Sequence, residues 1–354
     1  MFLHGFFMKE GLTLFILTIV FACLIFGSGY YLASCLINWF SLPPLIYLPM
    51  FLYDCVLFYY SKTYLVAKSK AMTYFIGISC FYYLFLILFS IPCHFLPIDP
   101  ISKGSSCFIL TTLLALHAYK RCQTLSIRKY SLPFLKKDTK IILLSDLHIG
   151  YYVGVSFIKN MVDRINAQHP DYVLIAGDLI NCRNTKECEQ IDEVALILST
   201  IHAPKGCYAI TGNHDPFYED EDFVTFLKKA QITLLDDSSI TDEELQIIGR
   251  RTRTEQRKDI QSFTKSDKPC IILDHDPLCI DDAISFGADA IFCGHTHKGQ
   301  LFPFTLLVKA IYHHKRDYGY HQEGNTHCII SAGTGYFSMP FRTGSTGEII
   351  VLTK

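Results

Sequence analysis

The sequence predicts an α/β domain preceded by a helical membrane region. The composition changes along the 354-residue chain: from residue 12 to residue 61 the only charged residue is Asp54. In the second half, short apolar runs alternate with segments in which apolar residues recur at helical spacing, which is the pattern of a β-α-β fold. A chain of this length can form two domains, and we place them at residues 1–130 and 138–354.

Four membrane spans are predicted in the first region. Uncharged runs also cover residues 71–98 and 104–119, and a helix needs about 20 mainly apolar residues to cross the hydrocarbon core. The prolines at 43 and 44 separate the first two spans, because they oppose helix continuation. A re-entrant or interfacial position is the alternative for the fourth span, because it is short. The spans are placed at about 12–40, 44–60, 71–91 and 105–119.

Lysine and arginine predict the orientation. With four crossings, two basic clusters fall on one face, which the positive-inside rule makes cytoplasmic. We therefore expect an integral protein of the inner (cytoplasmic) membrane with its catalytic domain in the cytosol. The basic residues either only fix this topology or also attract anionic lipid headgroups. The 14 cysteines form no C-x-x-C pair and indicate neither a disulfide framework nor a structural zinc site. The two clusters are Lys62, Lys68 and Lys70, and Lys120, Arg121, Arg128 and Lys129.

Five polar motifs stand where predicted strands of the second region end. They are SDLH at 145–148, GDLI at 177–180, GNHD at 212–215, His275, and GHTH at 294–297. The apolar runs before them predict strands at 140–145, 172–176, 207–211, 270–273 and 290–293. Parallel strands bring such side chains to the carboxyl edge of a sheet, where α/β proteins bind ligands.

These motifs contain a full ligand set for two divalent metal ions. Carboxylates and imidazoles suit such cations, and a pair of ions needs one carboxylate that serves both. Asp178 is the natural bridge, and His214 is left over as a general acid. A single histidine could equally be an ordinary core or surface residue, but five ordered motifs together favour a metal site. Asp146, His148 and His297 would complete one ligand set with Asp178, and Asn213, His275 and His295 the other.

The remaining elements follow from the same patterns. Helical spacing predicts helices at 155–169, 191–201 and 223–230, and an apolar run predicts a strand at 245–249. A late strand pair at 326–331 and 348–352 is expected to complete the second sheet. Arginines at 250, 251, 253 and 257 form a basic patch, which is either a solvated face or a contact to a substrate phosphate. Arg342, beside a glycine-rich turn, is the better-placed candidate for that contact.

The motifs SDLH, GDL, GNHD, HDP and GHTHKGQ resemble the five blocks of the calcineurin-like metallophosphoesterase superfamily, over roughly residues 138–354. DYGYH and SAGTGYFSMPFR look like the bacterial membrane-linked branch. The resemblance implies a four-layer α/β/β/α sandwich, a binuclear site that usually holds manganese, iron or zinc, and hydrolysis of phosphate esters or anhydrides. Two residues depart from the pattern: Lys298 replaces a usual glycine, and Asn181 replaces an aspartate that orients the catalytic histidine in many members.

The layout is similar to that of the membrane-anchored UDP-2,3-diacylglucosamine pyrophosphatases of lipid A synthesis. This resemblance implies a lipid-linked phosphate substrate, with Arg342, Asn181 and Arg251 as candidate substrate contacts and manganese as the expected metal. The alternatives are a membrane-bound phosphodiesterase of another phospholipid or a nucleotide, and a non-catalytic membrane sensor. Nothing in the sequence indicates a nucleic-acid partner or an obligate protein partner.

Overall fold

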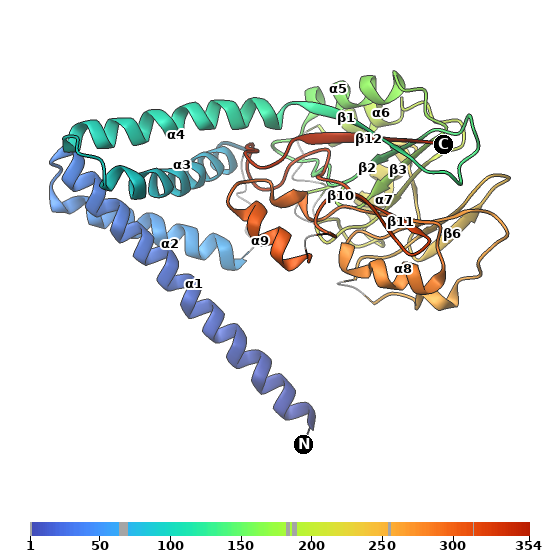
Figure 1. Ribbon diagram of the computed structural model, residues 1–354, viewed down its shortest axis with the longest axis horizontal. Helices are drawn as coiled ribbons and strands as arrows, with labels where there is room; N and C mark the ends of the chain where they lie inside the picture. The colour runs from blue at the N-terminus through green and yellow to red at the C-terminus, as the bar shows by residue number, and fades with distance from the viewer. Residues whose placement is uncertain (1, 64–69, 182–184, 186–189, 254–255, 314) are drawn as a thin grey trace. The chain divides into compact units, whose positions relative to one another are not determined.

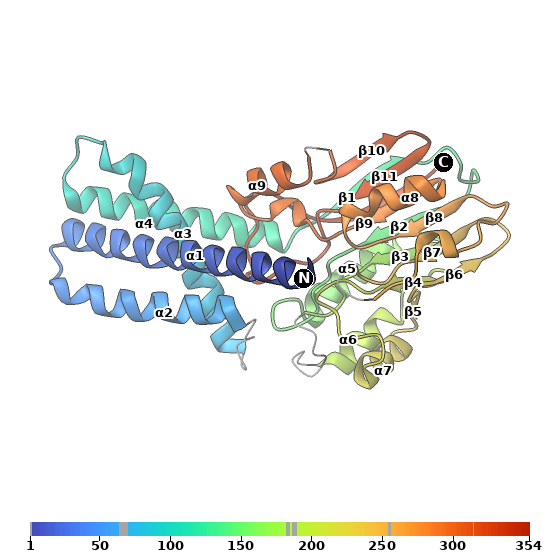
Figure 2. The ribbon, with the colours of Figure 1, turned by 90° about the horizontal axis from the view of Figure 1, so that it is seen from below.

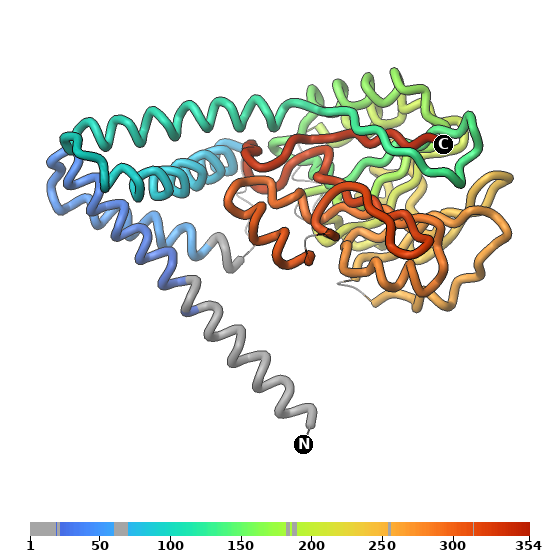
Figure 3. Tube along the Cα trace, in the orientation of Figure 1, coloured from blue at the N-terminus to red at the C-terminus, as the bar shows by residue number. Residues whose placement is uncertain are grey.

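The computed structural model describes residues 2–63, 70–181, 185, 190–253, 256–313 and 315–354 (Figure 3). For residues 2–18, 20, 21 and 60–63 it describes the backbone alone. The chain divides into two compact units, Met1–Leu116 and His117–Lys354. Lys68, which was expected to help set the membrane orientation, lies outside the described residues.

The first unit is helical. Within the described residues, three segments are long and apolar enough to cross a membrane: Ala22–Phe40, Lys70–His94 and Pro100–Cys122; a shorter apolar helix covers Pro44–Tyr59. The helices are α1 (Phe2–Phe40), α2 (Tyr47–Thr63), α3 (Lys70–His94) and α4 (Pro100–Cys122), the last of which runs into the second unit.

The second helix, not the fourth, is therefore the short one. Helix α4 begins before the uncharged run, where the side chain of Asp99 accepts hydrogen bonds from the backbone N–H of Ser102 at 3.0 Å and from its hydroxyl at 2.6 Å. Such an acceptor satisfies backbone groups that a helix leaves unpaired at its start. The helix ends beyond Lys120 and Arg121. The prediction from uncharged residues alone therefore placed both ends of α4 too far inside the helix.

Two six-stranded sheets form the second unit (Figure 1). The first has the order β1 (Leu125–Ser131), β12 (Gly347–Thr353), β2 (Ile141–Leu144), β3 (Tyr172–Ala176), β4 (Cys207–Ile210) and β5 (Thr233–Leu234). The second has the order β10 (Gly319–Glu323), β11 (Thr326–Ile330), β9 (Ala290–Cys293), β8 (Cys270–Leu273), β7 (Gln246–Gly249) and β6 (Ser238–Thr241).

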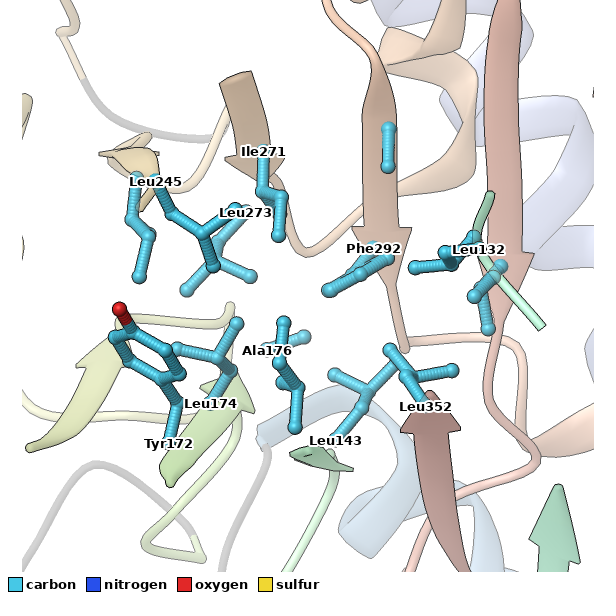
Figure 4. Packing of buried hydrophobic residues seen from close by; sticks show 14 of the residues in the cluster. Leu132, Leu143, Tyr172, Leu174, Ala176, Leu245, Ile271, Leu273, Phe292 and Leu352 are labelled. Atoms are coloured by element: carbon cyan, nitrogen blue, oxygen red, sulfur yellow. The ribbon is translucent and has the colours of Figure 1, made fainter. Parts of the chain in front are cut away.

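The sheets face each other across an apolar core. Side chains of Leu143, Leu174 and Leu352 from the first sheet meet those of Ile271 and Phe292 from the second (Figure 4). Burial on both faces explains why the central strands read as unbroken apolar runs. The outer faces are covered by helices α5 (Val155–Asn166), α6 (Ile191–Leu198) and α7 (Glu221–Lys229) on the first sheet and α8 (Ile280–Phe286) on the second (Figure 2). The predicted α/β/β/α sandwich is confirmed.

The last strand differs from the expectation. Strand β12 lies in the first sheet, where it pairs antiparallel with β2 and parallel with β1; only β11 joins the second sheet, beside β9. Strand β1 was not predicted, because its exposed Arg128 and Lys129 resemble basic residues beside a membrane. It pairs with β12 from Leu125↔Gly347 to Ser131↔Thr353. Alternation along a strand shows which face is buried, but it does not show which strand lies next to it.

The parallel strands bring the motifs together. Strands β2, β3 and β4 run parallel in the first sheet, and β7, β8, β9 and β11 run parallel in the second. Strands β3 and β8 contact each other across the sandwich. The loops that follow these strands therefore meet at one edge of both sheets.

Candidate metal centre

Five loops supply the side chains of the site. Several of the predicted ligands have left-handed backbone conformations, which cost about 1–3 kcal/mol each outside glycine and concentrate at functional sites. Hydrogen bonds between loops hold this backbone: the N–H of Asp146 donates to the carbonyl of Gly177 at 2.9 Å, and that of His148 to the carbonyl of Asp178 at 3.0 Å. The positive φ angles are 51° at Asp146, 48° at His148, 55° at Asp178, 71° at His295 and 47° at His297.

One group of potential ligands consists of Asp146, His148 and His297, all buried. The Nε2 atoms of the two histidines are 3.0 Å apart, and Nε2 of His297 is 3.4 Å from Oδ1 of Asp146. Burial lowers the pKa of His148 to about 3 and holds that of His297 well below its usual value. Both rings are therefore neutral near pH 7, and a neutral imidazole offers a lone pair to a metal ion. The group suits a divalent cation.

A second group consists of Asp146, Asp178 and His275. Oδ2 of Asp178 lies 3.2 Å from Nε2 of His275 and 3.6 Å from Nε2 of His148. It thus contacts one histidine from each predicted ligand set, as a bridging carboxylate must. Asp146 belongs to both groups, which the sequence did not predict.

The orientation of His275 is fixed from behind. Its Nδ1 lies 2.8 Å from the carbonyl oxygen of Ala176, and its Nε2 lies 3.2 Å from Oδ1 of Asn213. Burial alone would lower the pKa of His275, but the carboxylate of Asp178 raises it to about 10. Burial alone would raise the pKa of Asp178, but the adjacent His275 holds this pKa well below its usual value. Asp178 therefore draws positive charge strongly to this point.

His295 joins the site through both its backbone and its ring. Its N–H donates to Oδ1 of Asp146 at 3.0 Å, and its ring lies edge-on to that of His275 with centroids 5.1 Å apart. Burial lowers its pKa to about 4. All seven predicted ligands thus lie in one neighbourhood.

His214, the predicted acid, lies beside these ligands. Its backbone N–H donates to Oδ1 of Asp178 at 2.8 Å, and its ring centroid is 5.3 Å from that of His148. The ring of Phe337 packs on His214 with centroids 4.5 Å apart. Gln300 holds Phe337 in place: its Oε1 accepts from the N–H of Phe337 at 3.0 Å, and its Nε2 donates to the carbonyl of Phe337 at 2.9 Å.

Sequence reasoning assigned no role to three residues that build this site. Phe337 and Gln300 are two of them, and Asp215 is the third: its carboxylate accepts from the N–H of Ile180 at 2.7 Å and from that of Gly212 at 2.8 Å. It thereby joins the GDLI loop to the GNHD loop. Each of the three residues lies within one of the sequence motifs, at a position that holds no metal ligand. Their place in a motif was the sequence signal that could have identified them.

Glycines allow the loops to approach closely. A Cβ atom on Gly335 would lie 1.9 Å from the carbonyl oxygen of Leu147, and one on Gly212 would lie 2.5 Å from the backbone nitrogen of Asp178. Real Cβ atoms do not come this close to fixed backbone, so both positions need glycine. The SAGTG stretch is therefore packed directly against the SDLH loop.

Arg342 does not face a substrate. It is fully buried, and its two terminal nitrogens donate to the carbonyls of Ala332 at 2.9 Å, Gly333 at 3.3 Å and Gly335 at 2.5 Å and to the hydroxyl of Ser345 at 2.6 Å. Its expected role as a phosphate contact was wrong, because these acceptors take up the terminal nitrogens. Arg342 instead braces the loop that carries Gly335 and Phe337.

Arg251 is also committed to internal contacts. Its Nε donates to Asp236 at 2.7 Å, a second nitrogen bonds the same carboxylate, and the guanidinium lies 3.9 Å from the ring centroid of Tyr218. Asn181 follows the GDLI loop, and its Oδ1 is buried without a hydrogen-bond partner among the described residues. Lys298 has φ of 52°, which explains the glycine usual there, and its Nζ lies 4.1 Å from the ring centroid of Tyr318. For Asn181 a substrate contact stays a prediction.

Comparison with known proteins agrees with this site. Residues 139–299 match the calcineurin-like phosphoesterase family. The match supports the calcineurin-like metallophosphoesterase superfamily for this chain. An uncharacterized metallophosphoesterase of Helicobacter pylori strain J99 is 32% identical over 227 residues, which cover 62% of this chain and 60% of that protein. A zebrafish (Danio rerio) transmembrane protein with metallophosphoesterase domain is 29% identical, over 62% of this chain and 53% of that protein.

The chain thus spans about 60% or less of the length of these two relatives. A solved archaeal phosphodiesterase superposes with a TM-score of 0.34 and 16% identity, over 55% of this chain and 85% of its own. Like two relatives that are named as transmembrane proteins, the described part of this chain contains helices long and apolar enough to cross a membrane.

Proposed function

We propose that this protein is a membrane-bound phosphohydrolase that uses two divalent metal ions. One observation carries the proposal: loops from both sheets bring seven oxygen and nitrogen ligands together, with His214 at their edge. Two features of the site fit metal ions. The Nε2 atoms of His148 and His297 lie 3.0 Å apart beside the carboxylates of Asp146 and Asp178, and Asp178 lies between histidines of the two sets.

The residues divide between two ions as follows. Asp146, His148 and His297 would hold one, and Asn213, His275 and His295 would hold the other, with Asp178 shared. When bound, such ions supply Lewis-acid activation of the phosphate and of the attacking water. We propose manganese as the metal, with iron or zinc as the alternatives, because the family resemblance implies these metals; the mixture of carboxylate, amide and imidazole donors suits all three.

His214 is the proton donor for the leaving oxygen in this proposal. Its ring is adjacent to His148, while the hydrogen bond from its backbone to Asp178 ties its position to the ligands. Phe337 covers one side of the ring and limits its rotation. An imidazole held in this way can give a proton near neutral pH, as general acid catalysis requires. Phe337 and Gln300 then act as positioning residues.

We propose the pyrophosphate of UDP-2,3-diacylglucosamine as the bond that is cleaved. Water adds across the phosphorus–oxygen–phosphorus bridge and gives a diacylglucosamine phosphate (lipid X) and UMP. Support comes from the resemblance of the motifs and layout to the enzymes of this step, and from the apolar helices that would keep the chain beside a lipid substrate. The basic clusters at 62–70 and 120–129 favour the cytoplasmic face of the inner membrane.

The test uses the full-length protein in detergent with manganese. Incubation with UDP-2,3-diacylglucosamine should release UMP and a diacylglucosamine phosphate, measured by mass spectrometry. Two matched controls are the Asp178→Asn variant and UDP-glucosamine, which has the same pyrophosphate and no acyl chains. If the protein hydrolyses other phosphodiesters but not UDP-2,3-diacylglucosamine, the proposed substrate is wrong and the proposed hydrolase activity stands. No metal-dependent turnover of any phosphoester would overturn the hydrolase and favour a sensor.

A further inference from the structure

Helix α9 (Phe304–Ile311) presents apolar side chains to the outside of the second unit. None of the residues of this fully described helix is buried. Leu306 is 60% exposed and Leu307 56% exposed, and the exposed apolar set around them comprises Phe302, Phe304 and Ile311. Single exposed apolar residues are common, but a contiguous group of large ones marks a binding surface.

The side of α9 that faces the domain already has its packing contacts. Leu301 and Tyr312, just outside its two ends, are buried and anchor it. Thr305 and Val308, spaced like Tyr312 along one helical face, are partly covered. A surface helix normally has polar residues on its outer side. In α9 that side carries the two leucines instead.

The sequence segment that contains α9 carries charges of one sign only. From residue 294 to residue 316 the sequence has no aspartate or glutamate and four basic residues, Lys298, Lys309, Lys315 and Arg316. Arg316 is paired with Asp281 and Glu323, so the lysines carry the net charge. An apolar face flanked by cations is the composition of helices that lie in a membrane interface, where lysines meet anionic headgroups.

The helix is directly connected to the metal centre. The turn of His297, Lys298 and Gly299 packs against α9, and a Cβ atom on Gly299 would lie 2.6 Å from Cα of Thr305. The backbone N–H of Phe302 donates to Oγ1 of Thr343 at 2.8 Å, which joins α9 to the loop braced by Arg342. Whatever binds α9 is therefore held beside the catalytic loops.

We propose that α9 is a lipid-binding element that inserts its apolar side into the surface of a bilayer. Three segments among the described residues are able to cross a membrane, so a bilayer is the apolar phase available to this chain. Because α9 covers only Phe304–Ile311, it would hold the catalytic loops at the bilayer surface rather than anchor the whole protein. This inference goes beyond the proposed function, since it holds for any reaction at the metal centre.

The test is fluorescence quenching in reconstituted vesicles of phosphatidylethanolamine and phosphatidylglycerol with brominated acyl chains. Leu307→Trp in the full-length chain reports on α9, and Leu196→Trp is the matched control, because Leu196 is 62% exposed on α6. The signal of the native Trp39, measured in the unchanged protein, is subtracted. We expect bromine to quench about half or more of the added emission at 307 and little at 196.

Equal quenching at both positions overturns the proposal. Blue-shifted but unquenched emission at 307 would mean that protein, such as a second copy of the chain, covers α9, and would overturn it as well. A second variant carries both Leu306→Gln and Leu307→Gln, which remove the apolar side chains but keep residues with high helix propensity. It should lower the ratio of activity on a diacylated substrate to that on a soluble phosphodiester by about fivefold or more, with the soluble activity unchanged. The quenching result needs no turnover, so it stands even if the proposed substrate is wrong.

Discussion

Replacing Arg342 by methionine separates a structural arginine from a substrate-binding one. Methionine fills similar volume but leaves the acceptors at Ala332, Gly333, Gly335 and Ser345 without their buried donor. A buried acceptor that loses its donor costs about 1–3 kcal/mol. Relaxation of the loop recovers part of this, so we expect the loop to lose about 4 kcal/mol of local stability.

Hydrogen exchange measured by mass spectrometry reports this loss directly. The N–H groups of Thr334 and Gly335 donate to the carbonyls of Ser145 and Asp146 at 2.8 and 3.0 Å. Since each 1.4 kcal/mol is a factor of ten in an equilibrium constant, their protection should fall by up to about a thousandfold. Turnover should fall with it, because the loop carries Phe337.

The control is Arg128→Met. Arg128 is 54% exposed, and its Nε is 3.8 Å from Oε2 of Glu348, so its loss should cost about 0.5 kcal/mol or less. A raised KM in Arg342→Met, with protection of Thr334 and Gly335 unchanged, would refute the bracing role and restore a substrate contact.

Three further predictions concern the metal ligands, the acid and the acid stability. Asp178→Asn should lower the metal content, measured by inductively coupled plasma mass spectrometry, and should lower turnover by about 100-fold, because both ligand sets lose a member. Normal metal content with full activity would contradict the bridging role of Asp178. His214→Ala should keep its metal and lose about 100-fold on substrates with poor leaving groups but less on good ones, and an equal loss would rule out an acid. Hydrogen bonds from Arg316 lower the pKa of Glu323 from 4.5 to about 2. Because the pKa of Glu323 is depressed in the folded state, this stabilisation is present above about pH 4.5 and is lost as the pH falls towards 2. Glu323→Gln should therefore flatten the decline of the thermal midpoint over that range. An unchanged decline would exclude the pair of Arg316 and Glu323 as the cause of the decline.

The sequence predicted the ligands because each follows a short apolar run. Burial on both faces requires strands such as β2, β3 and β8 to be apolar throughout, so the polar motif after each run marks where the strand ends. That rule places Asp146, Asp178 and His275 at one edge, where the structure brings them together. The α/β class followed from the same alternation of strands and helices, and the four-layer sandwich followed from the family resemblance.

The tertiary structure decided what depends on distant partners. Residues 348–352 form a strand as expected, but the strand lies between β1 and β2, because pairing energy depends on neighbours far along the chain. Arg342 reads as a substrate contact beside glycines, yet the carbonyls of that same loop enclose it.

Asp146 and α9 show the same limit. Order along the chain assigns Asp146 to one ligand set, while the packing of loops places it in two. The outward direction of the apolar residues of α9 is visible only in the folded domain. Local patterns determine where a strand or helix forms, since they arise from backbone geometry and burial. Which surfaces meet is decided by contacts between residues far apart in the chain.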